Sequence, residues 1–262
     1  MCRASLRRSG FVTENILTLT DVVVAFDALR AVDGVSLVVP RGQRRAIIGP
    51  NGAGKTTLFN AITGVIPPTA GRVVFNGQEI TKLPPHRRAK LGISRTFQIT
   101  NLFPTLTVVE NMVLGIRGLS PNKFSLFGSP KTSASEDQRI AAALKSADMH
   151  HRLDTVVKEL SYGEQRQLEI ALALVTNPTT LLLDEPAAGL SPSERTVVAD
   201  IIKALPRDLT LILIEHDMAL ALGLADFVTC LHEGRVLVEE DPEAIRHNKT
   251  VQQVYLGTPR HA

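Results

Sequence analysis

Cysteine is scarce in this chain, with only Cys2 and Cys230 among 262 residues. Two cysteines predict no disulfide framework and no metal-ligand cluster, so a reducing cytoplasm is the simplest location. Long apolar runs are also missing, because none approaches the roughly 20 residues that span a bilayer. Internal repeats and low-complexity domains are absent as well. The length suits one large domain or two small ones.

Strong charge of either sign is absent too. The net charge is +3 and the isoelectric point is about 9.0, which permits contact with nucleic acid or an anionic membrane but argues for neither. The hydrophobic fraction of 44% and the charged fraction of 21% are ordinary for a soluble globular protein. The basic first ten residues lack the apolar centre of a secretory signal, so we expect a short disordered tail or a start codon placed slightly upstream.

The segment GPNGAGKTT fits the pattern G-x-x-x-x-G-K-[ST]. Glycines in the loop let its backbone N–H groups approach an anion at a helix N-terminus. Lys55 can reach the β- and γ-phosphates of a nucleotide, and the Thr56 hydroxyl can bind Mg²⁺. Strand-forming RRAIIG before the loop and helix-forming TTLFNAITGVI after it supply the required context. The predicted nucleotide-binding residues are Gly49, Pro50, Asn51, Gly52, Ala53, Gly54, Lys55, Thr56 and Thr57.

The N-terminal third also predicts a layer of antiparallel strands beside this core. Residues 16–26 read as one strand and residues 35–39 as its partner, with a turn around Asp33–Gly34. Asn76–Gly77 lies between two short strands and is a strong signal for a two-residue hairpin. Pro67–Pro68 should stop the helix that follows the phosphate-binding loop.

The middle of the chain changes from strands to helices after a short strand at 93–98. The expected order is a helix at 107–119, an exposed loop at 120–137, a helix at 138–153 and a third helix at 161–175. In the third helix Ser161 and Glu164 fit a capping box. Its apolar face is formed by Leu168, Ala171, Leu172 and Val175, whereas Glu164, Arg166 and Glu169 lie off that face. We therefore expect a mostly helical insertion in an α/β core.

Two apolar strands, at 179–186 and 209–216, are typical of a parallel sheet buried on both faces. A hairpin that turns at Glu233–Gly234 and a final helix with a short tail complete the expected elements. Ligands bind beyond the carboxyl ends of parallel strands. If the strands are neighbours, one phosphate site would gather the groups that end them: the loop from Gly49, Gln98, Asp184–Glu185 and His216.

Each of these polar groups can be interpreted as functional or as purely structural. Asp184 would orient Mg²⁺ through its water shell, and Glu185 would hold or deprotonate the water that attacks the γ-phosphorus. Gln98 can donate to a metal-bound oxygen and accept from water, and His216 could hold the γ-phosphate. The alternatives are a helix-capping acid, a surface amide and a structural histidine. Phe26 suits either core packing or stacking on an adenine ring.

The start of the third helix is a second candidate anion site. Ser161 and Gly163 stand at a helix N-terminus, where free N–H groups and the helix dipole attract negative charge. Two phosphate-binding ends in one chain suggest that two chains share nucleotides between them.

Taken in their order along the chain, these motifs resemble those of the ATP-binding subunit of an ABC transporter. The resemblance extends from Ile16 to Gly257. GPNGAGKTT corresponds to Walker A, Gln98 to the Q-loop, LSYGEQRQLEIA to the signature motif, LLLDEP to Walker B and IEHDM to the H-loop. Phe26 falls at the adenine-stacking position. The resemblance implies ATP and Mg²⁺ as cofactors, with Thr56, Gln98 and Asp184 at the metal.

The family's architecture gives further expectations. The fold would be an α/β P-loop NTPase core with a mainly parallel sheet, an N-terminal antiparallel β layer and an inserted α-helical subdomain. A tail at 1–13 would precede a single domain at 14–262, whose core comprises 14–99 and 178–262 and whose helical subdomain comprises 100–177.

The family also implies partners. Two ATPase subunits, identical or paralogous, would close head to tail over two ATP molecules. The signature residues of one subunit, Ser161, Tyr162, Gly163 and Glu164, would face the nucleotide held by Lys55 of the other. The helical insertion would grip two transmembrane permease subunits at the cytoplasmic face of a bacterial inner membrane. An extracytoplasmic solute-binding protein would act indirectly, and no nucleic acid is expected.

Finer details resemble the importers of branched-chain amino acids: RTFQ followed by LFPTLTVVENMVLG, then LDEPAAGLSP, and a tail VQQVYLG. Relatives that handle urea, short amides or aromatic acids look much alike. The chain departs from many members at Tyr162 and Glu164, where Gly and Gln are common, and at Ser191, where Asp is common. The last departure puts a cross-subunit carboxylate contact in doubt.

Two other classes remain as alternatives. A DNA-repair ATPase shares these motifs, but it usually carries long coiled coils, and the insertion here is short and lacks sustained heptads. A non-hydrolysing regulator is disfavoured by the intact Lys55, Asp184, Glu185 and His216.

Overall fold

The computed structural model describes residues 14–96, 102–118 and 132–256. Within them, a central sheet of six strands is ordered β10-β9-β3-β8-β7-β6. The strands are β3 (Arg44–Ile48), β6 (Ile93–Arg95), β7 (Thr180–Asp184), β8 (Thr210–Ile214), β9 (Phe227–His232) and β10 (Arg235–Glu240). All neighbours are parallel except β9 and β10, which form the predicted hairpin. Every residue of β3, β7 and β8 is buried, as expected for strands covered on both faces.

A second, antiparallel sheet has the order β2-β1-β4-β5 and confirms the predicted β layer. Its strands are β1 (Asn15–Phe26), β2 (Leu29–Pro40), β4 (Ala70–Phe75) and β5 (Gln78–Glu79). The Asn76–Gly77 turn is present, with positive φ at both residues. The predicted turn at Asp33–Gly34 is wrong, because the chain reverses at Asp27–Ala28. Gly34, at φ 72°, instead allows an irregular register inside β2, where the ladder gains an extra residue.

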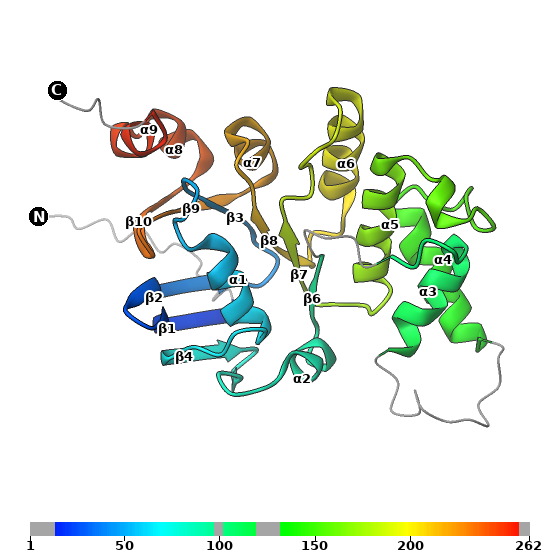
Figure 1. Cartoon of the computed structure of the whole chain (residues 1–262), viewed down its shortest axis with the longest axis horizontal. Coiled ribbons are helices and arrows are strands. Elements are labelled where there is room, and N and C mark those ends of the chain that lie inside the picture. Colours follow the sequence, from blue (N-terminus) through cyan, green and yellow to red (C-terminus); the bar gives the residue numbers. More distant parts are fainter. Residues whose placement is uncertain (1–13, 97–101, 119–131, 257–262) are drawn as a thin grey trace, which may run out of the picture.

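Helix α1 (Lys55–Thr63) lies between the two sheets (Figure 1). One hydrophobic cluster joins Leu58, Phe59 and Ile62 of this helix to residues of both sheets. The helix ends at Gly64, whose left-handed φ of 80° forms the C-cap. The prediction that Pro67–Pro68 stop it is therefore wrong, because the glycine ends it first.

The other face of the central sheet is covered by α6 (Pro192–Ala204) and α7 (Met218–Leu224), which share a second hydrophobic cluster with it. The C-terminal segment, expected as one helix and a tail, forms α8 (Pro242–His247) and α9 (Lys249–Leu256). The two separate at Asn248, which is extended and whose side chain accepts from the N–H groups of Thr250 and Val251.

The helical insertion gathers at one end of the molecule (Figure 1). Helices α3 (Val108–Arg117), α4 (Ala134–Ser146) and α5 (Tyr162–Leu174) enclose a third hydrophobic cluster. The predicted bounds of α4 are wrong. It starts inside the expected loop, because Ser133 and Glu136 form a capping box, and it ends before residue 153, with Asp148 at φ 55° just beyond it.

A buried arginine closes the far end of α1. Arg88, from α2 (Pro85–Lys90), is 1% exposed. Its guanidinium donates to the carbonyls of Ala61 and Ile62 at 2.6 and 2.7 Å, and to those of Thr81 and Leu83. Burial lowers its pKa to about 10, so it remains a cation at neutral pH. Arg88 thus satisfies carbonyls that a helix end leaves without partners.

Replacing Arg88 by Met should lower the free energy of unfolding by about 3 kcal/mol or more, because four carbonyls lose a charged donor. Urea unfolding followed by circular dichroism measures this. The control is Arg87→Met in the same helix, since Arg87 is exposed and the change should stay within about 0.5 kcal/mol. Equal stability of the two variants would refute the capping role.

Candidate nucleotide site

The loop between β3 and α1 is held by glycines at two close contacts. A Cβ on Gly49 would lie 2.3 Å from the Leu231 carbonyl oxygen, and one on Gly54 would lie 2.2 Å from that of Ala31. Gly52 has open space around it, so only its φ of 80° calls for glycine. Packing therefore requires two of the three glycines, and the conformation of the loop requires the third.

Lys55 is buried in this loop at the start of α1. Its ammonium donates to the carbonyls of Gly49 at 2.7 Å and Pro50 at 3.0 Å. Burial lowers the pKa of Lys55, although the negative charges of Glu185 and Asp184 oppose the shift. The ammonium is therefore close to both acids and held by groups that a phosphate could replace. Of the remaining loop residues, Asn51 and Thr56 are exposed, Pro50 and Thr57 are half-buried and Ala53 is buried.

The strand order brings the predicted polar ends together. Strands β3, β8, β7 and β6 are consecutive and parallel, so the loop from Gly49, His216 and Asp184–Glu185 follow neighbouring strands at the same edge. Gln98 lies outside the described residues. Its proposed roles at the metal and in catalysis stay predictions.

Asp184 is buried at the end of β7, and its two oxygens differ in their contacts within the described residues. Oδ2 contacts Nη2 of Arg95 at 2.5 Å, and Arg95 also donates to Oδ1 of Asn60 at 2.6 Å. Oδ1 of Asp184 has no hydrogen-bond partner among the described residues. A buried carboxylate oxygen without a donor fits a hydrated cation, and the exposed Thr56 hydroxyl supplies a second suitable oxygen. These groups fit Mg²⁺.

Glu185 differs from its neighbour in conformation and exposure. Its φ is 49°, in the left-handed region that non-glycine residues seldom adopt, and its N–H is tied to the Ile214 carbonyl at 3.0 Å. Its side chain is half-buried, with Oε2 3.8 Å from Nδ1 of the exposed His216. The two acids are therefore separated as expected: Asp184 is in the protein interior, whereas Glu185 reaches solvent.

Sequence reasoning missed two charged residues beside these acids. Arg95 fixes Asp184, and Glu215 lies immediately before His216 and is 1% exposed. Burial raises the pKa of Glu215, and its Oε1 accepts from the Ala187 N–H at 3.2 Å. Glu215 thereby holds the segment that follows Glu185. The signal in the sequence was present, because an acid at the end of an apolar strand needs a buried partner.

The start of α5 confirms the capping box. Ser161 accepts from the Glu164 N–H at 3.2 Å, and Glu164 accepts from the Ser161 N–H at 2.8 Å. Glu164 also accepts from Nε of Arg152 at 2.8 Å. The Glu164 carboxylate is therefore held both by the helix N-terminus and by an ion pair with Arg152.

The second anion site at this helix end is already bonded to an acid of the same chain. The Gly163 N–H donates to Oε1 of Glu194 at 3.1 Å, and a Cβ on Gly163 would lie 2.7 Å from that oxygen. Glu194 forms a capping box with Ser191 at the start of α6, which gives Ser191 a structural role. Hydrogen bonds from Ser191 and Gly163 lower the pKa of Glu194, so it remains an anion.

Helix α5 is buried on more sides than its apolar face predicts. Arg166 and Glu169, expected off that face, are both buried and pair at 2.7 Å. The reason is that α5 lies between the helical cluster and the core cluster, and contributes residues to both. Arg166 also donates to the Tyr162 hydroxyl at 3.2 Å and lies over its ring, so Tyr162 anchors this pair.

Phe26 ends β1 and is 47% exposed, which disfavours core packing. Adenine stacking stays a prediction for it. An apolar groove of about 420 Å³ lies elsewhere, between β6, α3 and α5. Its lining includes Phe103 and Leu114, which are 54% and 42% exposed, and the buried Glu169.

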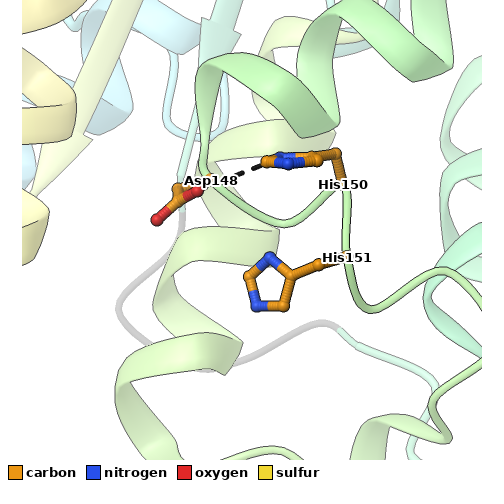
Figure 2. A group of neighbouring side chains, drawn as sticks. All are labelled: Asp148, His150 and His151. Carbon is orange, nitrogen blue, oxygen red and sulfur yellow. Dashed lines mark ion pairs between the residues drawn. The ribbon is translucent and has the colours of Figure 1, made fainter.

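Three potential metal ligands also lie together in the helical insertion (Figure 2). They are Asp148, His150 and His151, all exposed, with Nδ1 of His150 3.9 Å from Oδ1 of Asp148. The prediction of no metal-ligand cluster rests on the two cysteines alone, and this group of ligands contains no cysteine. His150 and His151 pack edge to face, with ring centroids 5.6 Å apart.

A glycine-rich loop between a buried strand and a helix, beside acid-ended parallel strands, defines a P-loop nucleotide-binding protein. Residues 32–188 match the family described as ABC transporter. The chain belongs to this family and is one of its ATP-hydrolysing subunits, which confirms the predicted resemblance and P-loop fold.

Individual relatives match nearly the whole length of the chain. It is 40% identical, over 92% of its length and 98% of the relative, to a high-affinity branched-chain amino acid transport ATP-binding protein, BraF, of Pseudomonas aeruginosa. The ADP conformation of MJ1267, an ATP-binding cassette of an ABC transporter, is 32% identical, with a TM-score of 0.83, covering 94% of this chain and 100% of that one. A dimeric bacterial cassette, MJ0796, is 26% identical, with a TM-score of 0.73, covering 87% and 99%.

Replacing Arg95 by Met should leave the Asp184 carboxylate buried without its cation, which costs about 3–5 kcal/mol of unfolding free energy. Urea unfolding measures the loss. The control is Arg72→Met, because the Arg72–Glu79 pair is more than half exposed and should contribute less than about 1 kcal/mol. A loss no larger than that of the control would show that Asp184 does not depend on Arg95.

Proposed function

We propose that this chain energises the import of branched-chain amino acids, or related small solutes, through a membrane ABC transporter. ATP would close two nucleotide-binding subunits on each other, and hydrolysis would let them open. The identity to BraF over almost the full length supports the solute class. The gathering of the β3, β7 and β8 ends at one edge of the sheet is the observation that carries the hydrolytic function.

The proposed hydrolytic site combines the loop with the strand ends. Lys55 and the loop amides from Gly49 to Thr57 would hold the phosphates, while Glu185 positions the attacking water and takes its proton, with His216 beside it. Thr56, Asp184 and Gln98 would hold Mg²⁺, which neutralises phosphate charge when bound. The exposed hydroxyl of Thr56 supports this assignment, as does Oδ1 of Asp184, which has no partner among the described residues.

In the proposed pair of subunits, the N-terminus of α5 would bind the nucleotide of the other subunit. Ser161 and Gly163 would contact the γ-phosphate held by the other subunit, with Tyr162 and Glu164 beside them. The solved dimer of a related cassette supports such pairing. Because Glu194 now accepts from Gly163, the incoming phosphate would have to replace that carboxylate.

The apolar groove is the proposed contact for the membrane subunits. It lies between the core strand β6 and the helical insertion, and its exposed Phe103 and Leu114 suit an apolar helix of a permease. No helix in the described parts of the chain is long and apolar enough to cross a membrane. We propose a peripheral subunit at the cytoplasmic face, divided into a core at 14–99 and 178–262 and a helical subdomain at 100–177.

The solute is tested by transport. The chain, its membrane subunits and a solute-binding protein are reconstituted in vesicles, and uptake of labelled leucine is compared with that of urea, a short amide and an aromatic acid. We expect ATP-dependent uptake of leucine, abolished by Lys55→Ala. Uptake of urea, amide or aromatic acid without leucine would assign the chain to another uptake system. Salt-sensitive DNA binding that stimulates ATP hydrolysis would instead indicate a repair-type ATPase.

Replacing Glu185 by Gln should retain ATP binding and reduce turnover by at least about 100-fold, because the amide cannot take a proton from water. Lys55→Ala should instead lose nucleotide binding. Calorimetry measures affinity, and phosphate release measures turnover. The exposed Glu243→Gln is the control and should match the wild type. Normal turnover of Glu185→Gln would remove Glu185 from the mechanism, and unchanged affinity of Lys55→Ala would contradict the loop assignment.

A further inference from the structure

The last described helix reaches back to the phosphate-binding loop. The hydroxyl of Tyr255, in α9, accepts a hydrogen bond from the Gly49 N–H at 2.5 Å, across 206 positions of sequence. The Tyr255 ring packs against the hydrophobic cluster on the α6 and α7 side of the central sheet. The half-buried ring therefore lies against the core, and its hydroxyl is directed at the first residue of the loop.

Gly49 is also held by two other contacts. Its α-carbon lies against the Leu231 carbonyl, which leaves no room for a Cβ, and its own carbonyl accepts from the Lys55 ammonium at 2.7 Å. The amide, the α-carbon and the carbonyl of one residue are thus fixed by α9, by β9 and by the phosphate-binding lysine. If the hydrogen bond from the Gly49 N–H to Tyr255 is removed, the peptide that precedes Gly49 is held less firmly. The Gly49 carbonyl, which accepts from Lys55, is then also less firmly placed.

Two ionisable groups beside this peptide, Tyr255 and Cys230, are uncharged at neutral pH. Burial raises the pKa of Tyr255 to about 12 and that of the neighbouring Cys230 to about 11. Both therefore stay protonated at neutral pH. A neutral hydroxyl can hold the Gly49 amide without opposing a phosphate, which a carboxylate at the same place would do.

We propose that Tyr255 is a positioning residue for ATP: it orients the Gly49 peptide and, through its carbonyl, the Lys55 ammonium. Tyr255 acts through the loop and does not touch the nucleotide. This inference rests on the proposed phosphate-binding role of the loop. It makes the C-terminal helix part of the nucleotide site, although that helix lies far from the loop in sequence.

The test is Tyr255→Phe, which keeps the ring and removes only the hydroxyl. We expect the dissociation constant for Mg-ATP to rise about fivefold, as for the loss of one hydrogen bond. The KM for ATP should rise in parallel, and kcat at saturating ATP should stay within about twofold of the wild type, because the groups that act on water are unchanged. The control is Thr250→Val, which removes an exposed hydroxyl from the same helix.

Calorimetry gives the affinities, and urea unfolding without nucleotide shows whether the fold is intact. Equal affinity of Tyr255→Phe and wild type would overturn the positioning role, as would a fall in kcat without a change in KM. An equal loss of affinity in Thr250→Val would also overturn it, because the effect would then belong to the helix in general. A wild-type chain that does not bind ATP would refute the proposed nucleotide site itself, and the positioning role with it.

Discussion

The close packing of α1 between the two sheets is the constraint on which the rest depends. Gly54 starts this helix against the Ala31 carbonyl of β2, and only a residue without a Cβ fits there. Its apolar side chains join both sheets in one cluster, and Arg88 bonds the carbonyls at its far end. A helix fixed at both ends and on both sides holds the Lys55 ammonium in one place. The antiparallel layer is therefore a support for the phosphate-binding loop.

Features that depend on residues close together in the sequence could be predicted. The apolar runs of β7 and β8 and the Asn76–Gly77 hairpin were found because each depends on neighbouring residues. Features set by distant partners could not. Gly34 looks like a turn in isolation, but pairing with β1 makes it an irregularity within a strand. Arg166 and Glu169 look like solvent-facing charges until the second neighbour of α5 is known.

In the candidate site, too, some residues could be predicted from the sequence and others could not. The residue types at the strand ends could be predicted, because parallel strands bring their carboxyl ends to one edge. Arg95 was missed, although it lies only three residues before the predicted Gln98 on the same segment. Its value as a partner of Asp184 appears only when β6 and β7 are seen to be neighbours. The Arg95–Asp184 pair, like the bonds of Arg88 to the carbonyls of Ala61 and Ile62, joins segments that are distant in sequence.

If two subunits close as proposed, the carboxylate of Glu194 on the Gly163 amide would affect the free energy of closure. In the single chain this N–H already has an anionic acceptor. A phosphate from a second subunit would exchange one anion for another, so the helix end would gain less than an unoccupied donor would. When that phosphate left, the carboxylate could return, and the Gly163 N–H would keep an acceptor. In the proposed cycle, the Gly163 amide would therefore contribute only a small part of the free energy difference between the closed and open pairs.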